Sequence, residues 1–327
     1  MKILEPNIDS FFNIKIHKEF ESQALQVFNY QYHKNIVYKR FVDLLNIDVK
    51  EVDASNKIPF LPISFFKSHK INIGKEETVF KSSGTTGQTR SQHFVTDTSV
   101  YKKSFTKGFE QFYGAISDYC FLGLLPSYIE QGESSLVYMV NDFINTTKHN
   151  GSGFYLDNFE ELNSKINELE TKKKKYILIG VSYALLDFID KFPQKKTSGI
   201  IMETGGMKGR RQELTKAELH NELIHGFNIS VIHSEYGMTE LLSQAYSQGE
   251  GIYKCPPWMK VITRSTTDPL SLVNNSRGLI NIIDLANINS CSFIATDDLG
   301  IVNPDGTFKI LGRFDASEIR GCNLMVN

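Results

Sequence analysis

The sequence is poor in cysteine, and the few cysteines it has are scattered. Four of its 327 residues are cysteines, and no two of them form a CxxC pair. Zinc sites and disulfide frameworks both depend on clustered or regularly spaced cysteines, so we predict neither. The histidines His220 and His225 lack the HExxH spacing of a zinc protease. We therefore expect them to have packing or surface roles.

A strong net charge is missing as well. The chain has 36 Lys and Arg residues against 37 Asp and Glu residues, which leaves a formal net charge of −1. This balance gives no electrostatic sign of a nucleic-acid partner. The first 14 residues contain no apolar core of a secretory signal, and the apolar run Tyr119–Pro126 has only the length of a strand. These absences predict a cytoplasmic protein without a membrane span and without a nucleic-acid ligand.

What the sequence does contain is an alternation of strand and helix patterns. Apolar side chains recur at helical spacing from Glu21 to Leu45, where we predict one helix. Further strands are predicted at 77–81, 119–125, 176–181, 199–202 and 229–233, and helices at 98–113, 134–144, 159–170, 183–192 and 216–227. This alternation is typical of an α/β fold with a mostly parallel sheet layered with helices.

The pattern changes after Pro257. Short runs at 259–264, 279–285, 293–296, 300–302 and 308–312 predict strands that are separated by turns. We therefore divide the chain into an α/β core with an N-terminal helical segment, residues 1–256, and a small β-rich C-terminal subdomain, residues 257–327.

The first of four polar loops follows the predicted strand at 77–81. It consists of Ser82, Ser83, Gly84, Thr85, Thr86 and Gly87. Glycines let backbone N–H groups turn inward and hydroxyls add donors, so such a loop suits phosphate oxygens. It is not a Walker A loop, because the GxxxxGK[ST] spacing is absent. A flexible surface turn is the alternative interpretation.

The other three loops add an aromatic ring, carboxylates and an arginine. Gly205 and Gly206 follow a predicted buried strand, where a glycine loop can lie flat against a base. The stretch HSEYGMTE ends the strand predicted next, and its carboxylates and hydroxyl suit Mg²⁺, which prefers oxygen ligands. The fourth loop combines TDD with LGRFD, whose Asp and Arg suit ribose or phosphate. Taken alone, the second loop is equally compatible with a charged surface turn, the third with a tyrosine and a glutamate that cap a helix, and the fourth with a turn followed by a hairpin. Only the four loops together favour a nucleotide site.

These loops resemble the motifs of the adenylate-forming superfamily of acyl-CoA synthetases, aryl ligases and peptide-synthetase adenylation domains. SSGTTGQTR resembles its phosphate loop, ETGG its adenine-side loop, EYGMTE its Tyr-Gly-x-Thr-Glu motif, TDD its ribose motif and GRFDASEIRG its hinge motif. The motifs occur in family order. The stretches ALQVFNYQYHKNIVY, IPFLPISFFKSHKI and RGCNLMV further resemble the acyl-protein synthetases of bacterial luciferase operons.

The resemblance implies that the chain activates a carboxylic acid, in those relatives a fatty acid, with ATP and Mg²⁺ and passes the acyl group to a thiol. It implies a role for each motif residue: Ser82 to Gly87 and Arg90 at the β- and γ-phosphates, Thr239 and Glu240 at the α-phosphate and Mg²⁺, Tyr236, Gly237, Gly205 and Gly206 around adenine, and Asp297 and Arg313 at the ribose. It also implies that Cys322 carries the acyl group before transfer to a reductase partner.

The chain departs from the superfamily pattern at two points. Arg90 follows Thr89 where the phosphate loop of the superfamily usually ends in Pro-Lys. Only twelve residues follow Asp315, so we expect the usual lid domain and its lysine to be absent. Two alternatives therefore stay open: a ligase that delivers to CoA or a carrier protein, and a non-catalytic scaffold that retains the fold.

Overall fold

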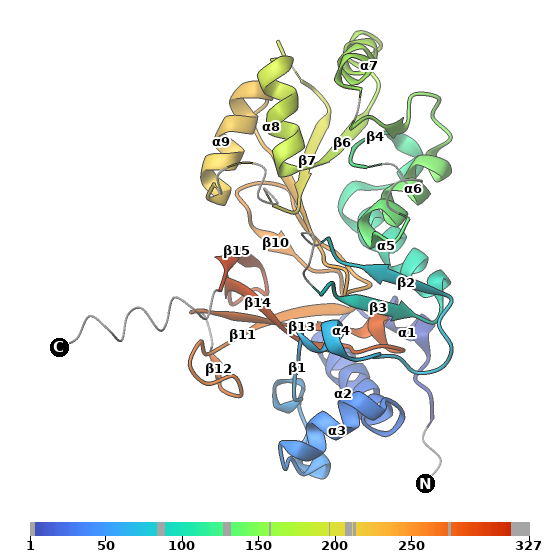
Figure 1. Ribbon diagram of the computed structural model, residues 1–327, viewed down its shortest axis with the longest axis vertical. Coiled ribbons are helices and arrows are strands. Elements are labelled where there is room, and N and C mark those ends of the chain that lie inside the picture. The colour runs from blue at the N-terminus through green and yellow to red at the C-terminus, as the bar shows by residue number, and fades with distance from the viewer. Residues whose placement is uncertain are drawn as a thin grey trace, which may run out of the picture.

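The computed structural model describes residues 4–83, 89–126, 132–156, 158–195, 197–206, 211, 214–273 and 276–314. Within these residues, thirteen strands form one continuous sheet. Figure 1 shows an α/β half at the top and a half rich in antiparallel strands below it. None of the helices in the described part of the chain combines the length and the apolar character needed to cross a bilayer.

The α/β half is built on parallel strands in the order β5, β4, β6, β7, β8. Their bounds are β4 (Cys120–Leu124), β5 (Gly153–Phe154), β6 (Tyr176–Val181), β7 (Ile200–Thr204) and β8 (His233–Tyr236). Every residue of β4 and β6 is buried, as expected of parallel strands that are covered on both faces. The helices that cover them are α5 (Thr98–Tyr113), α6 (Ser135–Thr147), α7 (Phe159–Thr171), α8 (Ser182–Lys191) and α9 (Lys216–Phe227).

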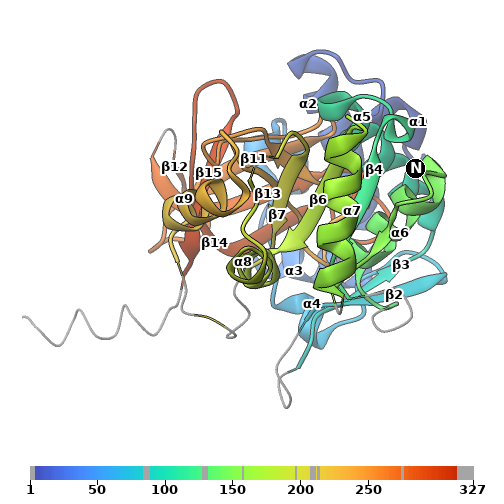
Figure 2. The ribbon, with the colours of Figure 1, turned by 90° about the horizontal axis from the view of Figure 1, so that it is seen from above.

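Two groups of helices pack on opposite faces of these strands (Figures 1 and 2). Helices α7, α8 and α9 meet around Phe188, whose ring lies 5.7 Å from that of Phe159 and 6.0 Å from that of Phe227. Helices α5 and α6 meet β4 around Phe143, which lies 5.0 Å from Phe109 and 5.2 Å from Phe121 between ring centroids. The mixed α/β class predicted from the sequence is therefore confirmed.

The sheet continues from β8 through antiparallel strands. The order is β9 (Ala245–Ser247), β10 (Tyr253–Lys254), β15 (Phe308–Arg313), β14 (Phe293–Val302), β13 (Arg277–Asp284), β11 (Met259–Arg264) and β12 (Leu272–Val273). The joint between the two halves is narrow, because β10 has two residues and pairs with β15 only through Tyr253 and Phe308. Parallel to β14 lies the short β1 (Leu61–Pro62), and a separate hairpin is formed by β2 (Thr78–Lys81) and β3 (Gln92–Val95).

The single helix predicted from Glu21 to Leu45 is wrong. The structure has two helices, α2 (His17–Lys34) and α3 (Ile36–Leu44), which are divided at Asn35. The backbone of Asn35 is extended, and its side-chain oxygen accepts a hydrogen bond from the backbone N–H of Tyr38. Its side-chain nitrogen donates to the carbonyl of Ser290 at 2.8 Å. The asparagine therefore caps the second helix and ties it to the β-rich half.

Two strand boundaries also differ from the prediction. The strand predicted at 229–233 begins only at His233, because Asn228 adopts a left-handed conformation and Ile229 bonds back to the carbonyl of Ile224 at the end of α9. The runs predicted as two strands at 293–296 and 300–302 form the single strand β14. The remaining helices are short: α1 (Ile8–Phe11), α4 (Phe65–Ser68) and the 3₁₀ turns η1 (Val49–Glu51), η2 (Ser55–Lys57), η3 (Ile116–Asp118) and η4 (Leu285–Asn287).

Candidate active site

Two of the predicted loops begin where the parallel strands β7 and β8 end. These two strands are parallel, and Thr204 pairs in register with Glu235. Gly205 directly follows β7, and Tyr236 is the last residue of β8. Both therefore lie at the carboxyl ends of the parallel strands. This is the edge at which open α/β sheets bind ligands.

Tyr236 joins this edge to the pair β14–β15. Its hydroxyl donates a hydrogen bond to Oδ2 of Asp298 at 2.7 Å, and Nε of Arg313 lies 3.6 Å from Oδ1 of the same carboxylate. The ring of Tyr236 packs against the rings of Tyr253 and Phe308, with centroids 5.8 and 5.5 Å away. Burial, and then the charge of Asp298, raises the pKa of Tyr236 well above its ordinary value. The phenol is therefore a fixed donor, and the EYGMTE loop and the hinge motif are held together.

Asp297, predicted at the ribose, is exposed. Its main-chain carbonyl accepts a hydrogen bond from the backbone N–H of Phe314 at 2.8 Å. Successive side chains of a strand point to opposite faces, so Asp298 rather than Asp297 meets Tyr236. Asp298 is a site residue that the sequence analysis did not assign. The carboxylate of Asp297 is left accessible to a ligand.

Glu240 is buried, with 5 % of its surface exposed. Burial raises the pKa of its carboxyl, while a hydrogen bond with Ser91 and the charge of Arg313 act in the opposite direction. A buried carboxylate with one hydroxyl partner is costly unless a cation accompanies it. The environment of Glu240 thus fits the metal-binding role predicted for it.

Two further residues hold the backbone of the Thr239–Glu240 loop. Nδ1 of His93 lies 2.8 Å from the carbonyl oxygen of Thr239, and the side-chain nitrogen of Asn287 donates to the carbonyl oxygen of Glu240 at 2.7 Å. Nε2 of His93 lies 3.0 Å from Oδ1 of Asn287. Burial lowers the pKa of His93 to about 4. The sequence analysis missed both residues. Neither residue belongs to one of the motifs, and β3, the strand that carries His93, was not predicted.

The ends of the Ser/Thr/Gly loop are fastened to one another. The backbone N–H of Ser82 donates to the carbonyl of Ser91 at 3.0 Å, and the backbone N–H of Ser91 donates to Oγ of Ser82 at 3.0 Å. Nε of Arg90 donates to the carbonyl of Ser82, and its Nη1 lies 3.7 Å from Oε2 of Glu133. Lys81 also pairs with Glu133, at 2.5 Å. Arg90 thus lies at the base of the loop.

Some predicted residues are not among those that the structure describes. The assignments of Gly84, Thr85, Thr86 and Gly87 to phosphate and of Cys322 to the acyl group lie outside the described residues. Ser82 and Ser83 are described and lead into the loop. The assignments to these residues stay predictions.

Two buried glutamates lie next to the Gly205–Gly206 loop, at the ends of β7 and β8. Glu203 pairs with Lys216 at 2.7 Å and lies 3.3 Å from Nε2 of His220. Although burial acts to raise its pKa, the charge of Lys216 and these hydrogen bonds lower the pKa of Glu203 to about 2. Glu235 lacks such a cation: it accepts a hydrogen bond from Oγ1 of Thr204 at 2.5 Å, and burial raises its pKa to about 7. The two carboxyls therefore differ in charge at neutral pH.

The space at Gly237 is limited by a side chain of the protein itself. A Cβ at this position would collide with Oε1 of Glu235. By contrast, a Cβ at Gly206 would meet no atom within 4 Å. Space beside Gly206 is thus open, as its predicted place near a base requires.

A family model described as acyl-protein synthetase, LuxE, matches residues 13–327. The chain belongs to the acyl-protein synthetase family. It is similar to the long-chain-fatty-acid–luciferin-component ligase of Vibrio harveyi, with 24% identity over 96% of this chain and 89% of the relative. The enzyme of the same name from Aliivibrio fischeri is 23% identical over 91% of this chain and 85% of the relative. The family resemblance and the assignment to the ligases are therefore confirmed.

Solved structures share the fold. ATP-bound MatB from Rhodopseudomonas palustris matches with a TM-score of 0.54 and 17% identity, over 73% of this chain and 49% of that chain. This chain thus spans about half the length of MatB. An open conformation of 2-hydroxyisobutyryl-CoA ligase in complex with 2-HIB-AMP and CoA matches with a TM-score of 0.60 and 11% identity, over 99% of this chain and 80% of that chain. At these identities the likeness concerns the fold of the adenylate-forming ligases.

The side chains that could bind a metal here suit an ion that is bound together with the phosphates of a nucleotide. Among the described residues, no group of three or more His, Cys, Asp or Glu side chains is arranged to hold a metal ion. Mg²⁺ commonly takes one or two carboxylates and completes its shell with phosphate oxygens and water. The single buried carboxylate of Glu240 therefore fits a nucleotide-bound Mg²⁺ better than a permanent metal centre.

Proposed function

We propose that this protein uses MgATP to convert a fatty acid into an acyl adenylate and then transfers the acyl group to a thiol, that of Cys322. The observation that carries the proposal is the convergence of three loops distant in sequence, at Gly205, at Tyr236–Glu240 and at Asp297–Arg313. Family membership supplies the chemistry that these loops would perform.

In the first half-reaction, a carboxylate oxygen of the acid attacks the α-phosphorus of ATP. The bond from that phosphorus to the bridging oxygen breaks, and pyrophosphate leaves with the electron pair. The protein's task is to position the reactants and to neutralise phosphate charge. Mg²⁺ held at Glu240 supplies part of that neutralisation when the nucleotide is bound.

We assign the other motif residues to parts of the nucleotide. Ser82, Ser83 and the Gly84–Gly87 loop would cradle the β- and γ-phosphates, with Arg90 fixed at the base of the loop. Thr239 would serve the α-phosphate. Gly205 and Gly206 would face adenine, and Tyr236 would fix the wall of this site through Asp298. Asp297 and Arg313 would hold the ribose.

In the second half-reaction, a thiolate attacks the acyl carbon, the bond from that carbon to the phosphate oxygen breaks, and AMP leaves. The thiolate rather than the thiol is the nucleophile. Burial raises the pKa of Cys120 and Cys255, and it raises that of Cys291 to about 12. These three thiols are unsuited to the attack, which supports Cys322 as the acyl carrier.

Intact-mass spectrometry after incubation with MgATP and a panel of fatty and aryl acids, without CoA, tests the proposal. We expect a hydroxylamine-labile acyl adduct on the wild-type protein that is lost in Cys322→Ser and kept in the control Cys255→Ser. Acid-dependent ATP–pyrophosphate exchange without an adduct would refute Cys322 and indicate CoA or a carrier protein as the acceptor. Neither signal with any acid would refute acid activation and favour the scaffold.

Delivery from Cys322 to a reductase partner is the last part of the proposal. It rests on the resemblance to luciferase-operon synthetases. Loss of the labelled acyl group on addition of a purified acyl-protein reductase and NADPH, with release of an aldehyde, is the expected result. An adduct that persists unchanged would contradict this step.

A further inference from the structure

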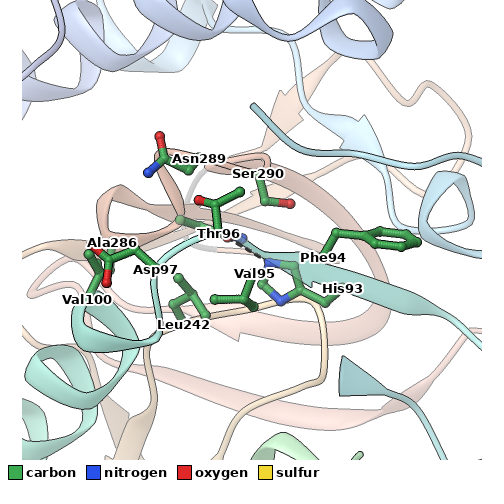
Figure 3. A pocket seen from close by; sticks show the side chains of 11 residues that line it. His93, Phe94, Val95, Thr96, Asp97, Val100, Leu242, Ala286, Asn289 and Ser290 are labelled. Carbon is green, nitrogen blue, oxygen red and sulfur yellow. Dashed lines mark hydrogen bonds between the residues drawn. The ribbon is translucent and has the colours of Figure 1, made fainter. Parts of the chain in front are cut away.

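The buried side chains of His93 and Asn287 lie next to each other behind the EYGMTE loop. Both side chains are fully buried. His93 lies on β3, and Asn287 ends the turn η4. His93 is one of the residues that line a cavity of about 10 Å³, which is no more than the space of one water molecule. Figure 3 shows its ring among these lining side chains. The ring of Phe66 packs edge-on against it, with centroids 5.7 Å apart. The imidazole therefore has little room for another position.

The pair holds two successive carbonyl groups of the loop. Nδ1 of His93 lies 2.8 Å from the carbonyl oxygen of Thr239, and Nε2 lies 3.0 Å from Oδ1 of Asn287. The neutral ring carries one N–H, and the tautomer with this proton on Nδ1 donates it to Thr239. Asn287 donates one N–H to the carbonyl of Glu240 at 2.7 Å and the other to that of Cys291 at 2.9 Å. Both side-chain N–H groups of the amide are thus used, and its orientation is determined by its partners.

The same strand also contacts the side chain of Glu240. Ser91 directly precedes β3 and lies two residues before His93, so the two side chains point to the same face. Ser91 bonds to the carboxylate of Glu240, while His93 and Asn287 hold the two carbonyls before and after its Cα. Strand β3 leaves the Ser82–Gly87 loop through Arg90. One strand therefore connects the phosphate loop with the backbone and the side chain of the proposed metal ligand.

We propose that His93, acting through Thr239 and Asn287, is a positioning residue that sets the carboxylate of Glu240 for Mg²⁺-bound ATP. This inference rests on the proposed function. His93 touches neither reactant, and it acts by holding the loop in one geometry. A buried carbonyl that loses its donor moves to find another, and the carboxylate one residue away moves with it.

The test compares His93→Leu, which removes both ring nitrogens, with His93→Asn, whose amide places a donor near the position of Nδ1. Asn287→Ala removes the donor to the carbonyl of Glu240. It therefore also displaces the Thr239–Glu240 loop, without a change at His93. Ser290→Ala is the matched control: Ser290 is buried, lines the same cavity and bonds to the carbonyl of Ile71 at 2.9 Å, but does not touch the loop.

Binding is measured by titration calorimetry of ATP with Mg²⁺ and with EDTA. In the wild type we expect Mg²⁺ to tighten ATP binding. In His93→Leu and Asn287→Ala this gain should fall by about tenfold or more, while the affinity for ATP in EDTA stays within about twofold. Ser290→Ala should keep the gain. An undiminished gain in folded His93→Leu or Asn287→Ala, an equal loss in Ser290→Ala, or no gain in the wild type would each overturn the inference.

Kinetics add a second readout. In ATP–pyrophosphate exchange, kcat of His93→Leu should fall by about 100-fold with the KM for the acid within about twofold of wild type, and His93→Asn should recover at least about tenfold of the loss. A fall in kcat accompanied by a rise in the KM for the acid, without recovery in His93→Asn, would indicate general damage and overturn the inference. If the wild type shows no exchange with any acid, the proposed function fails, and the calorimetry still decides the role of His93.

Discussion

Replacing Glu235 with glutamine removes the ionisation of a carboxyl buried beside the site. Burial raises the pKa of Glu235 from 4.5 to about 7. The folded state therefore holds its proton more tightly than the unfolded state does, and the wild-type protein loses stability as pH rises through the interval between these two values. A shift of this size corresponds to about 3 kcal/mol in full, of which about 2.5 kcal/mol falls between pH 5 and pH 8. Glutamine keeps an acceptor for the hydroxyl of Thr204.

Urea unfolding of the wild type and Glu235→Gln at pH 5 and pH 8 measures this effect. We expect the stability of the variant relative to wild type to increase by about 2 to 3 kcal/mol from the lower to the higher pH. Asp284, whose pKa burial raises to about 6, titrates in both proteins, so its contribution cancels in the comparison. A difference between the proteins that is the same at both pH values would refute the reasoning, because Glu235 would then titrate alike in the folded and unfolded chains.

Three further predictions concern single side chains at the site. Gly237→Ala should lower the free energy of unfolding by about 1 to 3 kcal/mol in urea, because its Cβ collides with Glu235, and an unchanged midpoint would contradict this. Lys216→Met should cost about 3 to 5 kcal/mol at pH 7, because it leaves the Glu203 carboxylate buried without its cation, and the cost should shrink in acid as that carboxylate takes up a proton. Asp297→Asn should raise the KM for ATP by about tenfold with little change in melting temperature, because its carboxylate is exposed, and an unaltered KM would remove Asp297 from the ribose site.

Much of the fold was predictable because its signals are local. The strands β4 and β6 are short, apolar runs, and α5 begins directly after Asp97, a common capping residue, whose side chain accepts from the backbone N–H of Ser99. The break at Asn35 was not predictable, because the apolar spacing continues across it. Asn35 is held there by a hydrogen bond to Ser290, which lies 255 residues away in the sequence.

The site was predictable in part for the same reason. The ETGG and EYGMTE motifs were sufficient to propose Gly205, Tyr236 and Glu240 as site residues, and these residues end or follow strands. His93 and Asn287 carry no motif, and their contact spans 194 residues, so only the folded chain shows that they meet. The choice between Asp297 and Asp298 likewise depends on which face of β14 each side chain takes, and TDD does not specify it.

The narrow joint at β10 has a consequence for how the protein melts. Two halves of the sheet meet through one residue pair, Tyr253 and Phe308, whose rings stack with centroids 5.3 Å apart and are covered by Tyr236. Few backbone hydrogen bonds of the sheet cross this aromatic joint. Buried side chains also couple the halves, because Asp284 of β13 accepts hydrogen bonds from Leu242 and Ser243. A chain in which both the joint and these contacts are weakened would unfold in two calorimetric transitions instead of one. The same tyrosine that organises the site thus also contributes to the folding of the two halves as a unit.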